Sequence, residues 1–305
     1  MTTDHRPPTT DHHTANVRDQ SSVVSGRWSL SVAIIAKDEQ RHIGAALDSV
    51  DGLAGEVIVL LDSRTSDRTA AISREHGARV VIEPWRGFAA QRNRALDLCV
   101  GDWVLFLDAD ERVTLELHDE ILGVLEGARR ETRDKRQGDK EIASQINSLS
   151  PVLPVSLSPA GYWIPRHNQF FGQTLRGGGW YPDHQLRLLR RGHTRYDEAR
   201  LVHEFAQLDG PAGYLSQHLL HLNIEHMDEL WRKQTSYAIQ EAQTLYKSGR
   251  RARWRNFIGA PLREFRRRYI SLGGYRDGAV GLLLCGTLAY FEWVKFVHLK
   301  ALERL

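Results

Sequence analysis

The sequence predicts an α/β fold with a mostly parallel sheet flanked by helices, on the basis of three observations. Short apolar runs alternate with helix-like segments between residues 30 and 107. Residues 57–61 and 103–107 are unbroken apolar runs, and residues 30–36 are apolar apart from Ser31, which is typical of strands buried on both faces. The order strand, helix, strand, repeated along the chain, favours parallel pairing with right-handed crossovers.

The first half supports this fold element by element. A helix is expected after the first strand, since Ile43, Leu47 and Val50 share one helical face. The next helix begins near Ser66 or Asp67, either of which can cap it, and ends at the glycine at position 77. A third strand at 79–82, a helix at 89–98 and the strand at 103–107 complete the half.

Composition narrows the class of protein. A chain of 305 residues has room for one large α/β domain with additions, or for two domains, and its 41% hydrophobic and 26% charged content is ordinary for a globular protein. The net charge of +3 gives no support for nucleic acid as a partner. Cys99 and Cys285 fit no metal or disulfide spacing, which suits a reducing cytoplasm. Residues 1–27 lack the apolar core of a signal peptide and are expected to form a disordered tail.

Acidic side chains follow three of the predicted strands. Asp38 and Asp62 follow the first two strands, and Asp108 and Asp110 follow the fourth. The carboxyl ends of parallel strands meet at one edge of a sheet, where ligands bind. Two acids spaced i, i+2 in extended backbone point to the same side and suit Mg²⁺ or Mn²⁺. A helix N-cap is the alternative for either member of this pair, but a cluster of acids from several strands favours a metal site.

The ligand is expected to carry its own phosphates. No Gly-x-Gly-x-x-Gly follows the first strand, and no Gly-x-x-x-x-Gly-Lys-Ser/Thr occurs in the chain. An acidic, metal-binding edge without a phosphate loop therefore indicates a nucleotide sugar.

Several motifs resemble those of family 2 glycosyltransferases with the GT-A fold. They are SVAIIAKDE (31–39), VIVLLDS (57–63) with Asp67, QRN (91–93) and GDWVLFLDADER (101–112). In the second half, YWIPRHN (162–168), GGWYPD (178–183), LRLLRR (186–191) and LVHE (201–204) are similar to the bacterial lipopolysaccharide-core β-glucosyltransferase group. The chain reads DSRTSD at 62–67 where the family often reads DSGSTD. This departure means that the resemblance does not determine which donor sugar is preferred.

The resemblance implies a role for each acid. Asp38 and Asp62 would contact the base and ribose of a nucleotide sugar, most simply a UDP-sugar. Asp108 would support the ribose or a metal-bound water, and Asp110 would ligate Mg²⁺ or Mn²⁺ on the diphosphate. Arg92 is a candidate for holding the diphosphate, the alternative being an exposed helix cation.

The expected acceptor half, residues 161–225, supplies candidates for the chemistry. An inverting transfer needs a base for the proton of the acceptor hydroxyl. Asp183 matches the position where the fold usually keeps this base, although an Asp after proline also forms turns. Glu204 is the reserve candidate, and His203 is a candidate for the metal or a phosphate or, equally, a structural histidine.

Other basic and flexible segments were assigned to the acceptor side. The glycines at 177–179 are expected to give a flexible approach to Asp183. Arg187, Arg190 and Arg191 are candidates for gripping an anionic acceptor, or are ordinary solvated arginines. Residues 129–160 are expected to be a flexible insertion next to the nucleotide-sugar-binding half at 28–128.

The last region, 226–305, is expected to be helical. Residues 212–248 also suggest helices, in which His218, His221 and His226 would be packing residues. The alternative, metal binding by His218 and His221 on one helix, lacks an evident third ligand. From position 250 arginines interleave with aromatic residues, and the apolar run 279–291 is shorter than a membrane-spanning helix. This pattern favours peripheral contact with the inner face of the cytoplasmic membrane over binding to nucleic acid, which lacks a fold motif here, and over a helix pair that only packs on the domain.

The leading hypothesis is a metal-dependent inverting glycosyltransferase that moves a sugar to a lipid-linked glycan acceptor of the cell envelope. One alternative is a polyprenyl-phosphate sugar transferase, a class that often carries membrane spans. The other is a non-catalytic binding protein with the same fold, which the intact acids Asp108, Asp110 and Asp183 disfavour.

Overall fold

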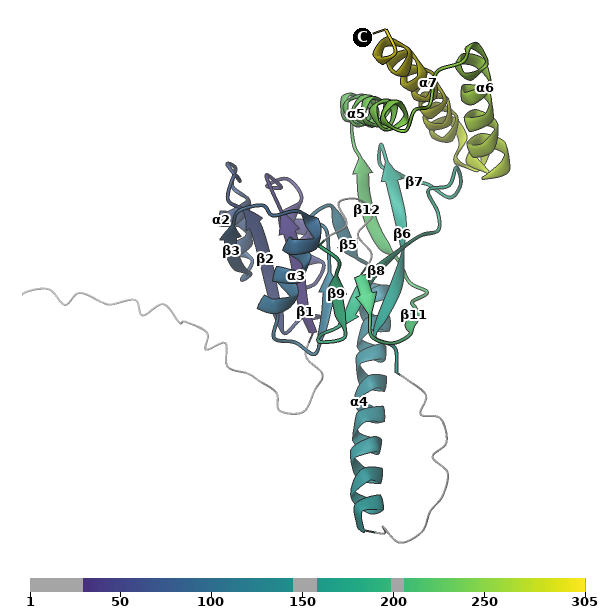
Figure 1. Ribbon diagram of the computed structural model, residues 1–305. Coiled ribbons are helices and arrows are strands. Elements are labelled where there is room, and N and C mark those ends of the chain that lie inside the picture. The colour runs from purple at the N-terminus through teal and green to yellow at the C-terminus, as the bar shows by residue number, and fades with distance from the viewer. Residues whose placement is uncertain (1–29, 145–157, 199–205, 305) are drawn as a thin grey trace, which may run out of the picture.

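The N-terminal half is the predicted doubly wound α/β unit. A computed structural model describes residues 30–144, 158–198 and 206–304 (Figure 1). Four parallel strands lie in the order β3-β2-β1-β4. The strands are β1 (Leu30–Ala36), β2 (Glu56–Asp62), β3 (Arg79–Glu83) and β4 (Trp103–Phe106), and the helices between them are α1 (Ile43–Asp48), α2 (Thr69–Glu75) and α3 (Phe88–Leu98). The predicted fold class is confirmed.

Each of the central strands buries both faces. Along β1, Val32 and Ile34 pack into the core on one side of the sheet and Ala33 into the core on the other. Helices α1 and α4 (Leu115–Ser144) supply residues to the first core, and α3 supplies them to the second. This alternation explains why the strands read as unbroken apolar runs.

The second half extends the same sheet with mixed pairing. Strand β8 pairs antiparallel with β4, and the order continues β8-β6-β12-β5. Strand β11 pairs with β6 parallel and β7 with β6 antiparallel, while β9 and β10 form a separate pair. The bounds are β5 (Glu111–Val113), β6 (Gly161–Phe170), β7 (Gln173–Thr174), β8 (Asp183–Arg190), β9 (Thr194–Tyr196), β10 (Ala206–Leu208), β11 (Ala212–Tyr214) and β12 (Leu219–Ile224).

The helical expectation for residues 212–248 is wrong in its first part. Residues 219–224 form β12, which pairs with β6 on one side and β5 on the other, and helix α5 (Met227–Lys247) begins only after it. A short segment with mixed apolar and polar residues has no decisive periodicity, so pairing with distant strands decides its conformation. The consequence for the site is direct, because His221 lies opposite Glu111, next to the Asp-x-Asp motif.

The flexible insertion expected from residue 129 also differs from the structure. Helix α4 continues without a break to Ser144 and projects away from the sheet (Figure 1). The charge run is rich in Arg, Glu, Lys and Gln, which have high helix propensity even without an apolar stripe. Residues 145–157 of the expected insertion lie outside the described residues.

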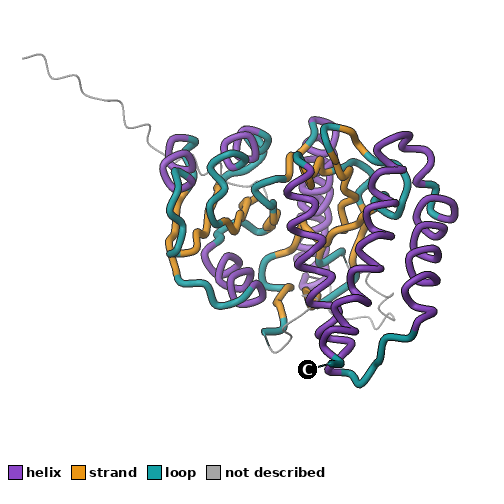
Figure 2. The backbone as a smooth tube through the Cα atoms, turned by 90° about the horizontal axis from the view of Figure 1, so that it is seen from above, coloured by secondary structure: helices purple, strands orange, loops and turns teal. Residues whose placement is uncertain are grey.

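The C-terminal region is a helical layer above the second half of the sheet, as predicted. It comprises α5, α6 (Trp254–Phe265), the π-helix η1 (Arg266–Ser271), the 3₁₀ helix η2 (Gly274–Asp277) and α7 (Gly278–Leu302). Helix α7 packs between α5 and α6 (Figures 1 and 2).

The length expected for the last apolar segment was too short. By length and composition the segment Gly274–Leu302 is sufficient to cross a membrane, with a mean hydropathy of 1.5 and 28% of its apolar window buried. Glu292 and Lys295, the charged residues that end the apolar run, lie inside this helix and pair with each other at 2.5 Å.

The glycines before β8 are held in place by this helical region. Asp277 accepts hydrogen bonds from the backbone N–H groups of Arg176 at 2.7 Å and Gly177 at 2.9 Å. The N–H of Gly178 donates to the carbonyl of Leu272 at 2.9 Å. A Cβ at position 177 would lie 2.1 Å from the Gly273 carbonyl oxygen, so only glycine fits this close approach. The glycines therefore serve contact with the C-terminal region instead of the flexible approach expected from the sequence.

Candidate active site

The loops after β1 and β2 join at the carboxyl edge of the sheet. Asp38 accepts a hydrogen bond from the backbone N–H of Ser66 at 2.7 Å. Asp67 accepts one from the N–H of Gln40 at 3.0 Å, in the opposite direction between the same loops. Both acids thus stabilise a shared loop surface, at the place where the sequence predicts nucleotide binding.

Asp62 is held by the residue that departs from the family pattern. Its carboxylate is 2% exposed and accepts hydrogen bonds from the backbone N–H of Arg64 at 3.0 Å and from the guanidinium of Arg64 at 2.5 Å. These bonds lower the pKa of Asp62 from 3.8 to about 2. Arg64 stands where glycine is frequent, so this chain covers the carboxylate with a cation whose side chain is 63% exposed.

Glu39 shows that the end of β1 lies close to the Asp-x-Asp motif. Burial first, and then the negative charges of Asp110 and Asp67, raise the pKa of Glu39 from 4.5 to about 7 against the opposite effect of Lys233. Acids from three strand ends therefore converge on one edge, as predicted from the sequence. Glu39 is part of the first motif, but its position in the sequence alone predicts no role for it.

The first acid of the motif, Asp108, is bound into a buried ion-pair network. Asp108 pairs with Arg187, and Arg187 also donates to Glu111 at 2.7 Å. The second carboxylate oxygen of Glu111 accepts the N–H of Asp108 at 3.0 Å. Burial alone would raise the pKa of Asp108, but the charges of Arg187 and Arg92 outweigh it and the pKa is lowered.

Arg187 is therefore not an acceptor-gripping residue, and both alternatives considered for it are wrong. It is 3% exposed and lies on β8 under the motif. Strand β8 pairs with β4, so Arg187 lies close to Asp108, which follows β4.

The same network continues to the predicted base. Arg166 on β6 donates to Glu111 at 2.9 Å and to Asp183 on β8 at 2.5 Å. Asp183 also accepts hydrogen bonds from Asn168 at 3.2 Å and Gln185 at 2.7 Å. Burial would raise the pKa of Asp183, but Arg166 and these donors lower it, so the carboxylate is ionised at neutral pH.

Asn168 connects Asp183 to the second acid of the motif. Its amide nitrogen donates to Asp183 and to the Trp180 carbonyl, so its oxygen accepts from Nδ1 of His221 at 2.6 Å. This bond turns Nε2 of His221 toward Asp110, 3.3 Å away. Burial would raise the pKa of Asp110, but the hydrogen bond and charge of His221 lower it.

His221 is the residue that the sequence analysis missed most clearly. It was assigned to packing because the segment was interpreted as a helix, in which His218 and His221 would share a face. In β12, side chains alternate, and His221 and Asn223 both lie within hydrogen-bond distance of Asn168. Arg166 and Asn168 had a signal, because both lie in the YWIPRHN motif at alternate positions of one strand.

Arg92 lies in the site, although it is on α3. Its guanidinium is 5.2 Å from the ring centre of Phe106 and 5.6 Å from that of Tyr196, and 3.9 Å from Asp108. With 19% of its side chain exposed, it is not the exposed helix cation considered as the alternative. His203 and Glu204 lie outside the described residues.

Asp110 and His221 fit a divalent cation. Their donor atoms are one carboxylate and one imidazole nitrogen, the second oriented by its bond to Asn168 as metal-bound histidines usually are. Asp108 is engaged by Arg187 and Arg92, which leaves Asp110, beside His221, as the member of the motif that is available to a cation. In the described part of the chain no group of three or more His, Cys, Asp or Glu side chains is placed to hold a metal ion. The arrangement suits Mg²⁺ or Mn²⁺, which leave positions for phosphate and water.

Comparison with known proteins gives a consistent picture. The family model for glycosyl transferase family 2 matches residues 31–131. The lipopolysaccharide core biosynthesis glycosyltransferase LpsC of Rhizobium meliloti is 30% identical over 87% of this chain and 89% of its own length. An uncharacterised glycosyltransferase of Rickettsia conorii is 48% identical over 30% of this chain and 32% of its own length. Glucosyl-3-phosphoglycerate synthase of Mycobacterium tuberculosis, solved with Mn²⁺, UDP and glucosyl-3-phosphoglycerate, is 32% identical over 36% of this chain and 40% of its own, with a TM-score of 0.26.

The buried network predicts a large stability cost for Arg187→Met. Removing the guanidinium of Arg187 takes away one of the positive charges that pair with the buried carboxylate of Glu111. Breaking a buried ion pair in this way costs about 3–5 kcal/mol of folding stability. The matched control is Arg195→Met, which breaks an exposed pair with Asp97 and should cost less than about 1 kcal/mol. Urea unfolding followed by circular dichroism measures both. Equal, small losses would contradict the structural role of Arg187.

The raised pKa of Glu39 predicts that Glu39→Gln increases the thermal stability of the protein in a pH-dependent way. The folded state holds this proton up to about pH 7 and the unfolded state only to 4.5, so the wild-type protein loses stability as the pH rises through this interval. The variant should match the wild type near about pH 5 and exceed it in thermal stability near about pH 8, in metal-free buffer. Glu126→Gln, at an exposed position on α4, is the control and should show no such trend. A constant offset at both pH values would refute the assignment.

Proposed function

Because the chain belongs to glycosyl transferase family 2, we propose that it transfers a sugar, with inversion, from a UDP-sugar to a lipid-linked glycan of the lipopolysaccharide core. The observation that carries this proposal is the continuous set of contacts from Asp110 through His221 and Asn168 to Asp183. It joins the predicted donor side to the predicted base across the two halves of the sheet.

On the donor side, the loops with Asp38 and Asp62 are proposed to receive the base and ribose. Arg92 and Asp108 line the next part of the edge, where the diphosphate would lie. Asp110 and His221 would hold Mg²⁺ or Mn²⁺, which neutralises the charge of the departing diphosphate. His203 remains a further candidate ligand from the sequence.

On the acceptor side, Asp183 is proposed as the base. The acceptor oxygen forms a bond to the anomeric carbon, the bond from that carbon to the diphosphate breaks, and the hydroxyl proton moves to Asp183. Arg166 and Asn168 fix the carboxylate in one orientation and keep it ionised. A positioned base of this kind typically contributes about 10²- to 10⁴-fold to the rate. Glu204 remains the reserve candidate.

The polyprenyl-phosphate alternative can no longer be set aside for lack of a long apolar helix, because α7 has the length. The lipopolysaccharide core is favoured instead by the relative LpsC, which matches over 89% of its length. A non-catalytic role is disfavoured by the Asp110–His221 pair and the ionised, oriented Asp183.

The helical region is proposed to dock on the inner surface of the cytoplasmic membrane. On α6, Trp254, Ile258 and Leu262 are 80%, 61% and 63% exposed and recur every four residues, which forms one apolar stripe. Exposed arginines at positions 255, 263 and 266 flank it and suit anionic headgroups.

Surface docking fits α7 better than a crossing. The polar helix α5 packs along α7, with Trp231 against Phe291 at 5.1 Å and Glu241 paired with Lys295 at 2.9 Å. Moving α7 into the hydrocarbon layer would require breaking these contacts or burying the charges of α5, which is costly.

Substitutions in the site separate donor binding from transfer. Asp110→Asn and His221→Ala should weaken Mn²⁺-dependent binding of UDP about tenfold or more, since each removes a proposed ligand. Asp183→Asn should keep UDP binding and lose transfer about 10²-fold or more. Calorimetry and a transfer assay provide the readouts. Mn²⁺-dependent UDP binding that survives loss of both Asp110 and His221 would exclude the metal site, and normal transfer by Asp183→Asn would move the base to Glu204.

Charges on the α6 stripe should release the protein from membranes. The double variant Trp254→Glu/Ile258→Glu should bind phosphatidylglycerol-containing vesicles about tenfold or more weakly, because burial of one large apolar side chain is worth roughly 1.5–3 kcal/mol. Leu115→Glu, at a position 82% exposed on α4, is the matched control. Vesicle flotation measures the bound fraction. Equal binding by the double variant and the control would contradict docking through α6.

A further inference from the structure

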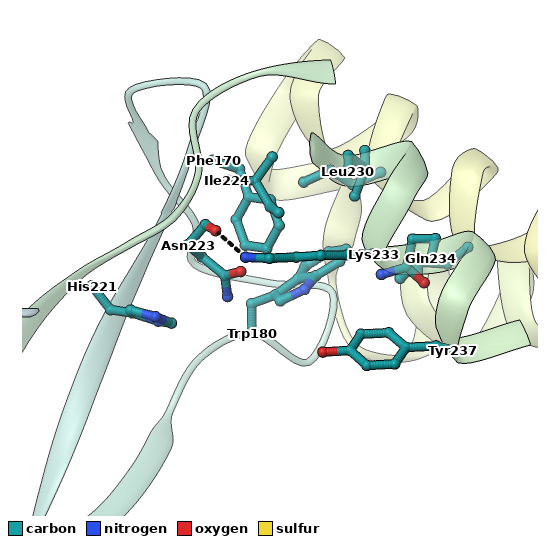
Figure 3. A pocket seen from close by; sticks show the side chains of 11 residues that line it. Phe170, Trp180, His221, Asn223, Ile224, Leu230, Lys233, Gln234 and Tyr237 are labelled. Carbon is teal, nitrogen blue, oxygen red and sulfur yellow. Dashed lines mark hydrogen bonds between the residues drawn. The ribbon is translucent and has the colours of Figure 1, made fainter. Parts of the chain in front are cut away.

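A pocket of about 340 Å³ lies between β12, the loop before β8 and helices α5 and α7 (Figure 3). One end is formed by His221, the neighbour of Asp110, and the other by Leu284 and Leu288 of α7. This volume is within the range of about 300–1,000 Å³ that is usual for ligand pockets. A ligand in the pocket would also reach the edge at which Asp110 and Asp183 lie.

The lining combines aromatic rings with amides. Trp180 comes from the loop before β8, and Tyr237 comes from α5. Asn223 lies on the His221 side of Trp180, and Gln234 lies on α5 with Tyr237 (Figure 3). A sugar ring has an apolar face of C–H groups and a rim of hydroxyls. Aromatic faces cover the first, and amides both donate to and accept from the second. The lining therefore suits a carbohydrate better than a purely apolar ligand.

Trp180 is positioned by the same residue that positions the proposed base. Asn168 donates to the Trp180 carbonyl at 2.8 Å and to Asp183 at 3.2 Å. Gly178 has φ +66°, and a Cβ there would lie 2.0 Å from the Trp180 ring, so the glycine makes room for the ring. The guanidinium of Arg268 lies 5.3 Å from the ring centre. The platform and the base thus form one rigid unit.

The pocket continues toward the helical surface. A second cavity of about 280 Å³ shares Trp180, Gln234, Tyr237 and Leu288 with the first and extends to Glu264 and Arg268. These last two residues lie on α6 and η1 and pair with each other at 2.5 Å. The two cavities together therefore give room for a ligand that extends from its sugar toward the C-terminal helices.

We propose that the pocket is the acceptor-sugar subsite, with Trp180 as the stacking platform, Tyr237 across from it, and Asn223 and Gln234 bonded to hydroxyl groups. The assignment rests on the proposed glycosyl transfer to an envelope glycolipid. It identifies the part of the acceptor that is recognised and places that recognition outside residues 31–131, the segment shared with the family model.

The test is titration of the wild-type protein, with Mn²⁺ and UDP present, with the lipid-free core oligosaccharide of Rhizobium meliloti lipopolysaccharide. Trp180→Ala and Tyr237→Ala should each weaken binding of the oligosaccharide about tenfold, and Trp180→Phe should restore most of it. Tyr237 is 54% exposed, so its truncation tests the pocket without a risk to folding. Tyr246→Ala, on the same helix outside the pocket, is the control and should bind normally.

Two further measurements distinguish failure of the acceptor subsite from failure of the proposed function. Mn²⁺-dependent hydrolysis of UDP-glucose by the wild type reports on the donor site alone, and both hydrolysis and vesicle binding should be unchanged in Tyr246→Ala, because Tyr246 lies outside the pocket. Oligosaccharide binding that is absent in the wild type, or that is insensitive to both substitutions, while hydrolysis proceeds, would overturn the subsite and leave the proposed function intact. If the wild type neither binds UDP nor hydrolyses UDP-glucose, both the subsite and the proposed function would be overturned.

Discussion

Two arginines, one buried and one partly buried, lie between three acids and hold the halves of the sheet together at the site. Arg187 joins Asp108 to Glu111, and Arg166 joins Glu111 to Asp183. A buried charge without its partner is costly, so each strand that contributes to this network is restricted to one register. The constraint explains why β4, β6 and β8, which are distant in sequence, bring their charged side chains together at one edge.

Because of this constraint, the two acids of the Asp-x-Asp motif have different contacts. Asp108 is paired with arginines in the network, and Asp110, two residues later, is paired with His221. The i, i+2 spacing predicted that both side chains would point to one side, but the local environment separates their roles. A comparable difference occurs at Asp62, where Arg64 covers the carboxylate that the family pattern would leave beside a glycine.

The C-terminal helices contribute more than a covering layer. Asp277 fixes the loop before β8, and that loop carries Trp180 toward Asp183. The same helices expose apolar side chains and arginines on their outer surface. The region therefore links the proposed base, the proposed acceptor pocket and the proposed membrane surface through direct contacts, which is a reason to treat it as part of the enzyme.

The sequence by itself determined the α/β class, the four parallel strands and the acids at their carboxyl ends, because buried parallel strands leave an unbroken apolar pattern and a polar end. Motif resemblance added the family and a candidate base at Asp183. Only the tertiary structure decided that residues 219–224 form a strand, that His221 meets Asp110 and that Arg187 is buried under the motif. Those features depend on pairing between strands far apart in the chain, and the energy of such pairing is not encoded in any local period of the sequence.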